Sequence, residues 1–537
     1  MSPWLKIKTK FKIGGAKIGM VKTLNSISDD PRISIPASEY DRIEINKRYY
    51  ADDRKMITFK NSYGRSRTRQ MYSINIVKMA ARRLASIIFN EKCKVTVDDS
   101  QANDVIDQVF QDNDFYDNFE TFLEKAIALG SGCIRPTFNN GKIKLSWATA
   151  DQVYPLDTNT SEVNNIAIAF KSQRTENHTT IYYTLLEFHQ WDQESSTYTI
   201  TYELYRSDSS DEVGVNVDLA TLDEYAGLPQ NIKFQNITAP LFAFYRNPGA
   251  NNRNLDSPLG LGIPDNTRPI IDAINRTHDE FVEEVVKGRR RIAVTASMLT
   301  SMNNNRRNSS NSAHPPLYDE DETVFVPLYA DNSDVGVKDL TTSIRTPEYT
   351  QAMDFFLHEF ESATGLSQGT FTTTPSGVQT ATEVVSNNSM TYQTRSSYLT
   401  MVEKTIDNLV KAILQLASSG EQFINKDYAW NGDISDITIN CDFNDGVFVD
   451  QTAQQQADLQ AVTANALPIK EFLIRNYDLD EITAEKWMEE LQEEKTTNAP
   501  DMEEAFIGSN SSDDTDSGDK DEESDTGSDD EQGEQDS

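Results

Sequence analysis

The sequence predicts an α+β fold in which helices pack with antiparallel strands, and three patterns indicate it. A seven-residue apolar repeat fills a stretch without Gly or Pro between Val378 and Ser419. Two helical patterns of similar length, near 269–287 and 346–365, bracket a polar insert. Between 141 and 206 the apolar period changes to two, which is typical of antiparallel strands packed on one face.

The repeat predicts one long helix. At ~1.5 Å rise per residue, a continuous helix from Val378 to Ser419 would be roughly 60 Å long. Ten of the twelve repeat positions are apolar, and Arg395 can pack its aliphatic stem. A helix of that length needs several neighbouring elements or a large assembly to cover it. The first repeat position holds Val378, Val385, Tyr392, Leu399, Ile406 and Ile413, and the position three residues later holds Ala381, Asn388, Arg395, Val402, Leu409 and Leu416.

The chain is strongly acidic. Its 537 residues, enough for several domains, carry a net charge of −35. The segment 501–537 contains sixteen acids and one lysine, which is −15, so the remaining body carries −20 (−35 minus −15). We expect disorder from Thr497 onward because few apolar residues lie there. An acidic surface repels nucleic acid, although a channel through which DNA slides without sticking can also be acidic.

Cysteine use and hydropathy exclude several classes of protein. Cys93, Cys133 and Cys441 have no close spacing, so neither a disulfide framework nor a zinc site is predicted, and we expect a cytoplasmic origin. No apolar run approaches the ~20 residues that span a bilayer. The basic segment 6–13 lacks the continuous apolar run of a secretory signal. We expect this segment to dock on an acidic neighbouring subunit, with surface binding as the alternative.

Ahead of the strands, apolar spacing predicts helices over 40–91 and 114–130, the second ending at a glycine. Within the first lies a basic segment with two tyrosines. It predicts either a nucleic-acid contact or, as we favour, a loop that pairs with an acidic surface. The dipeptide at 140–141 is a hairpin signal, and 207–235 is predicted as a polar loop. The basic segment consists of Lys60, Arg65, Arg67 and Arg69, with Tyr63 and Tyr72 among them.

The two helices of matched length are predicted to pack as an antiparallel pair. Pro269 suits the first turn of the first helix, and Gly288 suits its C-terminal end. A cap, a proline and an acid in that order, beginning at Thr346, start the second helix, and Gly365 ends it. Each helix has about 18 residues and is therefore ~27 Å long, so the two can lie side by side.

The remaining segments are predicted more coarsely. The insert 292–345 is expected to form a small module at the far end of the pair, with a strand at 324–326 and an exposed polar stretch at 303–312. Residues 428–449 alternate like strands, and 451–495 fit two or three helices.

No pattern supports an enzyme. The chain lacks a Gly-x4-Gly-Lys-Ser/Thr phosphate loop and a Gly-x-Ser-x-Gly elbow. Asp442 to Gly446 resembles a calcium loop only faintly, because its glycine falls one position early and no glutamate closes it. His358 has no second histidine four residues away, which favours a structural role. We therefore predict no catalytic residue, no cofactor and no metal.

Four short motifs occur in a definite order along the chain. Together with the order helix, insert, helix, Thr/Gly loop and long helix, they resemble the portal proteins of tailed bacteriophages. The resemblance is closest to the portal family of long-tailed phages that infect Gram-positive bacteria, and it covers roughly 40–495. The motifs are Ala85–Glu91, Ser257–Pro264, Thr364–Ser367 with Gly369–Phe371, and Thr380–Val384.

The resemblance implies a ring, typically of twelve copies, at one capsid vertex. Double-stranded DNA would be packaged and ejected through it, and its partners would be the terminase large subunit, the head–tail adaptor, and the major capsid and scaffold proteins. Assembly would take place in the host cytoplasm, away from membranes, and the ring would end in the virion. The parts implied are a basic N-terminal arm (1–39), a wing of helices and antiparallel strands (40–264, completed by 378–450 with the long helix), a first stem helix (265–291), a small α/β clip (292–345), a second stem helix (346–365), a tunnel loop (366–377), a helical crown (451–496) and a disordered acidic tail (497–537).

The same resemblance suggests functional residues. An uncharged tunnel loop does not trap phosphates, and acids on the first stem helix would repel DNA if they face the channel. The basic residues after that helix either guide the DNA backbone or pair with an adjacent subunit's acids. The tunnel loop contains Ser367, Gln368, Gly369, Thr370, Phe371, Thr372, Thr373, Thr374, Pro375, Ser376 and Gly377; the channel-lining candidates are Asp272, Asp279, Glu280, Glu283 and Glu284; the basic candidates are Lys287, Arg289, Arg290 and Arg291.

Two alternatives belong to other classes of protein. One is a minor head or scaffold protein that does not form a portal. The other is a DNA-packaging enzyme subunit, such as a nuclease or an ATPase, and the missing phosphate loop argues against the ATPase.

Overall fold

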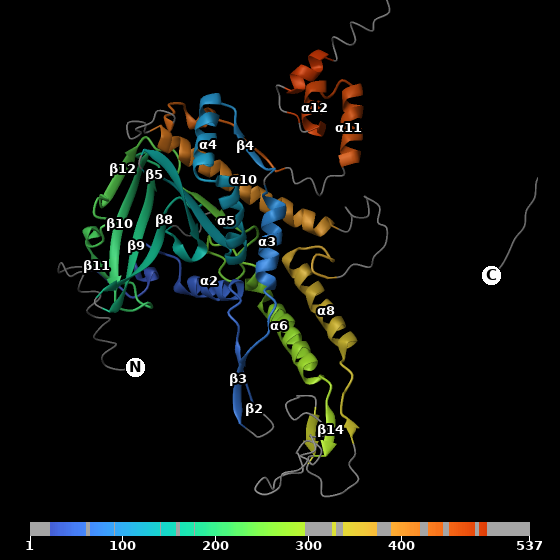
Figure 1. Cartoon of the computed structure of the whole chain (residues 1–537). Helices are drawn as coiled ribbons and strands as arrows, with labels where there is room; N and C mark the ends of the chain where they lie inside the picture. The colour runs from blue at the N-terminus through green and yellow to red at the C-terminus, as the bar shows by residue number, and fades with distance from the viewer. Residues whose placement is uncertain are drawn as a thin grey trace, which may run out of the picture. The chain divides into compact units, whose positions relative to one another are not determined.

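The computed structural model shows a mixed fold of helices and antiparallel strands, as predicted (Figure 1). The chain divides into two compact units, 1–449 and 450–537, and each is described by itself. The structure describes residues 22–60, 65–90, 92–139, 141–156, 162–176, 178–295, 325–328, 337–372, 388–418, 428–443, 451–477, 479 and 483–490.

The antiparallel region consists of two sheets instead of the single meander that the sequence suggested. Three long strands, β8 (Ile166–Glu176), β9 (Thr179–Asp192) and β10 (Thr197–Ser207), form the centre of the larger sheet. The hairpin predicted at 140–141 is confirmed by the pairing of β5 with β6, but these strands pair with β13 in a separate sheet. The bounds are β1 (Thr23–Leu24), β5 (Ser131–Asn139), β6 (Lys142–Thr149), β7 (Val153–Pro155), β11 (Gly214–Val217), β12 (Asn231–Gln235) and β13 (Ala243–Arg246).

The segment 207–235, predicted as a loop, was partly misread. Its strands β11 and β12 both pair with β10, at opposite ends of that long strand. Strands of four and five residues offer few positions for apolar alternation, so the pattern is too short to stand out in a polar sequence.

The prediction of continuous helix over 40–91 is wrong in its middle. Helices α2 (Ala37–Tyr50) and α3 (Ile76–Ile88) flank a β-hairpin of β2 (Met56–Lys60) and β3 (Ser66–Gln70). The hairpin is largely exposed and carries no apolar stripe. The sequence therefore gives no strand pattern there, and the helical pattern of the two flanking helices led to the prediction of helix across it. Figure 1 shows it extending away from the sheets, beside the first helix of the matched pair.

Packing of helices on the smaller sheet forms the main core. The helix predicted over 114–130 is confirmed as α5 (Phe115–Leu129), which ends at Gly130 with φ of 107°. Its aromatic rings pack on those of α4 (Ser100–Asp112), where Phe110 and Phe115 stack with ring centroids 3.8 Å apart. The long helix α10 (Ser389–Ala417) contacts β5 and β13 and closes this core.

The seven-residue repeat holds only for the C-terminal half of α10. Val402, Ile406, Leu409 and Ile413 are completely buried, whereas Tyr392 is 53 % exposed. The helix has 29 residues and is therefore about 44 Å long, while 378–387 lie outside the described residues.

Arg395 is buried at a repeat position by hydrogen bonding as well as by packing. Its Nε donates to the carbonyl of Ile87 at 2.7 Å, and a terminal nitrogen donates to the carbonyl of Phe443 at 2.8 Å. A guanidinium satisfied in this way replaces the apolar residue that the repeat favours there.

Of the strand pattern predicted over 428–449, the described part, 428–443, contains β17 (Ile439–Asp442), which pairs with β4 (Lys94–Val97), whereas 444–449 lie outside the described residues. The second unit contains α11 (Gln451–Thr463), α12 (Ile469–Tyr477) and a helix over 483–490, in line with the helices predicted there. None of the helices in the described ranges is long and apolar enough to cross a membrane.

Candidate channel-forming helical pair

The two matched helices pack on each other in antiparallel orientation, as predicted. They are α6 (Pro264–Lys287) and α8 (Thr346–Thr364), side by side in Figure 1. Phe281 and Tyr349 bring their ring centroids to 5.4 Å, and Glu284 pairs with Arg345 at 3.0 Å. These contacts join the C-terminal end of α6 to the N-terminal end of α8.

Beyond these ends lies a small three-stranded sheet. Strand β14 (Ile292–Thr295) pairs in parallel with β15 (Phe325–Leu328) and antiparallel with β16 (Lys338–Asp339). The strand predicted at 324–326 is thereby confirmed, shifted by one residue, whereas 303–312 lie outside the described residues.

Helix α6 begins five residues earlier than predicted, so Pro269 lies inside it rather than in its first turn. A proline lacks the N–H that would bond to the carbonyl four residues before it, here that of Asp265. The guanidinium of Arg253 donates to this carbonyl instead, at 2.6 Å. The side chain thus replaces the missing backbone donor.

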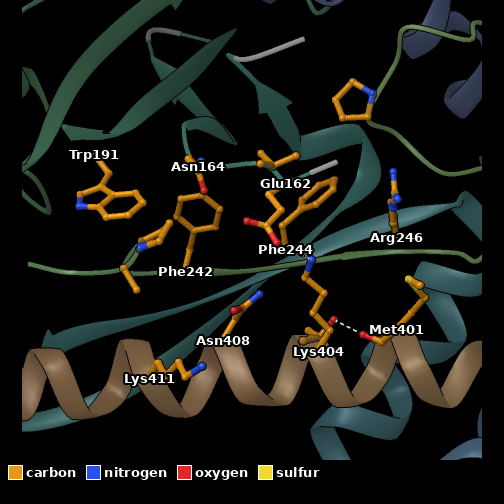
Figure 2. Close-up of a pocket in the computed structure, with 15 residues that line it drawn as sticks. Glu162, Asn164, Trp191, Phe242, Phe244, Arg246, Met401, Lys404, Asn408 and Lys411 are labelled. Carbon is orange, nitrogen blue, oxygen red and sulfur yellow. Dashed lines mark hydrogen bonds and ion pairs between the residues drawn. The ribbon is translucent and has the colours of Figure 1, made fainter. Parts of the chain in front are cut away.

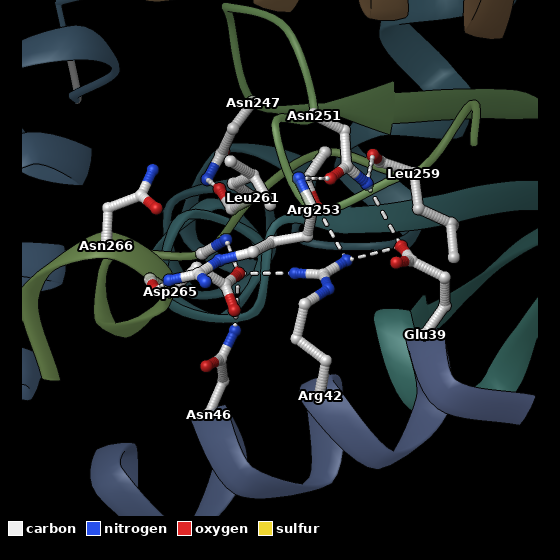
Figure 3. Close-up of polar contacts among 12 residues, drawn as sticks. Glu39, Arg42, Asn46, Asn247, Asn251, Arg253, Leu259, Leu261, Asp265 and Asn266 are labelled. Carbon is white, nitrogen blue, oxygen red and sulfur yellow. Dashed lines mark hydrogen bonds and ion pairs between the residues drawn. The ribbon is translucent and has the colours of Figure 1, made fainter. Parts of the chain in front are cut away.

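A buried polar network fixes the start of α6 to α2 (Figure 3). The carboxylate of Asp265, only 1 % exposed, accepts hydrogen bonds from the guanidinium of Arg42, from Asn46 Nδ2 at 2.8 Å and from the N–H of Gly262 at 2.7 Å. Arg268 donates to its other oxygen at 3.0 Å. A negative charge in the first turn is also favoured by the dipole of α6.

The same arginine links a second carboxylate into the network. Arg42 donates to Glu39 at 3.0 Å and to the carbonyl of Gly260 at 3.1 Å. Glu39 also accepts from Asn251 at 3.0 Å and from Ser257 at 3.2 Å. Buried carboxylates are satisfied here by donors from three segments of the chain, so the direction of α6 is set by the body of the protein.

The glycines of the segment 257–264 are required by close backbone packing. A Cβ on Gly260 would lie 2.3 Å from the carbonyl oxygen of Gly130, and a Cβ on Gly262 would lie 2.2 Å from that of Ala128. The loop before α6 therefore presses directly against the end of α5. This contact gives a physical reason for the Leu-Gly-Leu-Gly pattern in the motif.

The most buried of the predicted channel-lining acids is occupied within the chain. Asp279 accepts two hydrogen bonds from Arg69, at 2.6 and 2.8 Å, and one from the N–H of Tyr72 at 2.9 Å. The bond from Arg69 lowers the pKa of this carboxyl. Glu283 pairs with Arg69 at 3.1 Å and with Lys287 at 3.0 Å. For Arg69, the favoured pairing of the basic segment with an acidic surface is confirmed.

Two more of the five acids also have cationic partners. Asp272 pairs with Lys55 at 3.1 Å, and Arg345 lowers the pKa of Glu284 by hydrogen bonding to it. Glu280 has no ion pair among the residues that the structure describes, and its side chain is exposed. The exposed side of α6 therefore carries mixed charge, with Arg276, Glu280 and Lys287 on it.

The basic cluster after α6 lies on the surface, near the small sheet. Arg289, Arg290 and Arg291 are exposed, and Lys287 is 71 % exposed although it pairs with Glu283. They are accessible to DNA and to a second chain alike, so both roles remain proposals.

The predicted tunnel loop falls partly outside the described residues. The first residues after α8 fold back onto that helix and onto the start of α10. Gly365 ends α8 with φ of 73°, as predicted, and a Cβ there would lie 2.3 Å from Thr394 Oγ1. Ser367, Gln368, Gly369, Thr370, Phe371 and Thr372 are described, whereas Thr373, Thr374, Pro375, Ser376 and Gly377 are not.

Glu361 holds the base of this loop. Its carboxylate is completely buried and accepts the backbone N–H of Phe371 at 2.6 Å and that of Thr372 at 3.2 Å. Ser367 and Thr391 bond to each other's backbone N–H through their hydroxyls, at 2.8 and 3.1 Å. The two ends of the segment between α8 and α10 are thus joined.

A pocket of about 260 Å³ lies between α10 and the sheets (Figure 2). Trp191, Phe242 and Phe244 form its aromatic wall, and Lys404 pairs across it with Glu162 at 2.9 Å. The volume is at the small end for ligand sites, and Glu162 is the only carboxylate among its described lining residues. Nothing in this arrangement identifies a ligand.

Sequence reasoning missed the residues that position the pair. Glu39 and Arg42 lie on α2, far along the chain from Asp265. The one local signal is Asp265 itself, an acid in the first turn of a helix that begins at Pro264. No sequence pattern distinguishes Glu361 from the many other acids of the chain. His358 contacts Glu361 at 3.2 Å, which agrees with the structural role predicted for this histidine. No group of three or more potential metal ligands was found among the described residues.

Comparison with known proteins places the chain in a family. No curated protein shows significant similarity to it. Among solved structures it is similar to a chain of the virion of a native gene transfer agent particle, with a TM-score of 0.35, 10 % identity, and coverage of 86 % of this chain and 97 % of that one. For a chain from the neck of the native particle, computed with C12 symmetry, the values are 0.34, 11 %, 86 % and 97 %. The family described as phage portal protein, SPP1 Gp6-like, matches residues 29–500, so the chain belongs to the phage portal proteins, which occupy a capsid vertex.

Proposed function

We propose that copies of this chain form a ring, of twelve subunits, through which double-stranded DNA is packaged and later ejected. Membership of the portal family supports this proposal, and the α6–α8 pair carries it structurally. The pair is fixed at one end by the network around Asp265 and ends at the other in a small sheet. Helices held in this way can line a channel, because the body of their own subunit sets the direction of α6.

The parts of the chain then take the roles expected of a portal. The pair α6–α8 forms the stem, 292–345 the clip, 366–377 the tunnel loop, and 451–496 the crown. The clip docks the terminase large subunit during packaging and the head–tail adaptor afterwards, while the wing meets the capsid and scaffold proteins. Assembly takes place in the host cytoplasm, and the protein acts as a conduit without catalysis of its own.

The channel wall that α6 offers is close to neutral. Four of the five predicted acids are paired with Lys55, Arg69 or Arg345, and Glu280 is the one of the five without a cationic partner among the described residues. A wall of weak net charge serves translocation, because each phosphate that is neutralised strengthens a salt-dependent grip on DNA. The uncharged tunnel loop extends this surface.

Two experiments test the proposal. Negative-stain images of the purified chain should show rings with an axial hole, and monomers or filaments would contradict it. Deletion of 373–377, which spares the contacts of Glu361, should leave rings intact and lower the DNA content of particles. A deletion of equal length in the tail, 511–515, serves as the control. Loss of rings in the first variant alone would refute the tunnel-loop role.

A further inference from the structure

The hairpin β2–β3, called here the ribbon (56–70), has one side on α6 and one side in solvent. Because side chains alternate along a strand, Ile57 and its cross-strand partner Arg69 share a face, and this face bonds to Asp279. Met56 and Lys60 lie on the opposite face, which is exposed, and Met56 is 63 % exposed. The ribbon is thus bonded to α6 through Arg69, while its outer face has no cover within the described chain.

The charge and apolar content of the ribbon are unusual for this acidic chain. Residues 56–70 contain four cations and no acid, in a protein with a net charge of −35. A two-stranded hairpin is marginally stable alone, and exposed strand edges invite pairing or packing with another chain. These features indicate a contact surface for an acidic partner that also offers apolar side chains.

Helix α8 presents such a surface. It contains four acids and neither Lys nor Arg. Its exposed stripe, spaced by three or four residues, runs through Glu348, Gln351, Phe355 and Glu359. Phe355 in the middle of this stripe is 64 % exposed, which is costly for an aromatic ring that stays in water.

The two surfaces lie on different sides of the helical pair. The ribbon bonds to α6 through Arg69, whereas the stripe on α8 lies on the side opposite Met353 and Leu357, which pack against the core. Figure 1 shows the ribbon on one side of α6 and α8 on the other. Two different patches on opposite sides of one subunit are what a head-to-tail contact needs in order to close into a ring.

We infer that the outer face of the ribbon of one copy docks on the exposed stripe of α8 of the next copy. Met56 packs against Phe355, and Lys60, ~13 Å further along the strand, faces Glu348, which lies ~10 Å from Phe355 along α8. The inference rests on the proposed ring and names the contact that joins its subunits at the stem. It also accounts for the attachment of the ribbon to α6, because a fixed ribbon loses little entropy on docking.

Charge reversal tests the electrostatic part in the full chain. We expect K60E and E348K each to raise the concentration at which half of the chain is in rings by about tenfold. The combined variant should return to within about threefold of the parent, because opposite charges face each other again. R82E, on the exposed side of α3, is the matched control for added negative charge. Failure of the combination to restore assembly would overturn the inference.

Cross-linking tests the contact itself. Cys93 and Cys133 are buried, so replacement of the half-exposed Cys441 by Ser gives a parent chain whose native thiols should not react with the cross-linker. In that background, M56C/F355C treated with a short bis-maleimide should give a ladder of covalent multimers, whereas either single variant and the pair M79C/F355C should not. Rings without a ladder would refute this contact and leave the proposed function standing. Absence of rings from the parent chain would refute both.

Discussion

Replacement of Asp265 by alanine should release α6 from the body of the protein. The carboxylate is 1 % exposed and accepts from Arg42, Asn46, Gly262 and Arg268. Removal of one partner of a buried ion pair costs ~3–5 kcal/mol, because the remaining charge is left buried without compensation. Arg42 keeps its contact with Glu39, so we expect about 3–4 kcal/mol, near the lower end of that range.

The expected effect is measurable in the full chain. With an unfolding entropy of ~2.1 cal/mol/K per residue, the unit of about 450 residues would melt roughly 3–4 °C lower. Large chains often unfold irreversibly, so the half-life at a fixed temperature should be recorded as well. Hydrogen exchange should increase first at the start of α6 and in the loop before it, because these segments lose their acceptor.

An exposed acid on the same helix provides the control. Asp272 pairs with Lys55, but their side chains are 43 % and 65 % exposed, so D272A should cost no more than ~1 kcal/mol. The variant D265N keeps an acceptor for the N–H of Gly262 while it removes the charge, and should fall between the two. If D265A and D272A were equally stable, the network would not hold α6 and the reasoning would be wrong.

Four further outcomes are expected. Arg69 lowers the pKa of Asp279, so the pair stabilises the folded ribbon at a pH above 3.8, the ordinary pKa of the carboxyl group. This stabilisation is lost as the pH falls through the lower pKa of the folded state. Hydrogen exchange of the ribbon should show that step, and R69Q should abolish it. G262A should destabilise the chain by ~1–3 kcal/mol in thermal melts, because its Cβ has no space. E361A should expose the loop after α8 to proteolysis, since two backbone N–H groups lose their acceptor. Truncation at residue 500 should leave the melting temperature unchanged, because 501–537 have too few apolar residues to fold.

The features predicted well from the sequence are those with local signals. Helix α8 has a proline in its first turn and ends at Gly365, which adopts the left-handed conformation that glycine allows. Helix α5 ends in the same way at Gly130. The hairpin turn after β5 was also predictable, because a two-residue connection favours an Asn-Gly pair.

The features that escaped prediction depend on contacts between distant segments. Pro269 is tolerated inside α6 because Arg253 bonds to the carbonyl that the proline leaves without a donor. Tyr392 occupies an apolar position of the repeat and is exposed, since its neighbours Thr391 and Arg395 take the buried side at that end of α10. Arg42 and Asp265 are separated by 223 residues, and no periodicity relates them.

Two hypotheses that the sequence raised separately concern residues that form one contact. The acids of α6 suggested a wall that repels DNA, and the basic segment around Arg69 suggested either a DNA contact or a partner for acids. The structure joins Arg69 to Asp279 and Glu283, which removes charge from both surfaces at once. The same contact turns Met56 and Lys60 outward. In the proposed ring, the electrostatics of the channel and the contact between subunits would therefore share residues. A variant at Arg69 should then change assembly and DNA passage together, whereas one at Glu280 should change DNA passage alone.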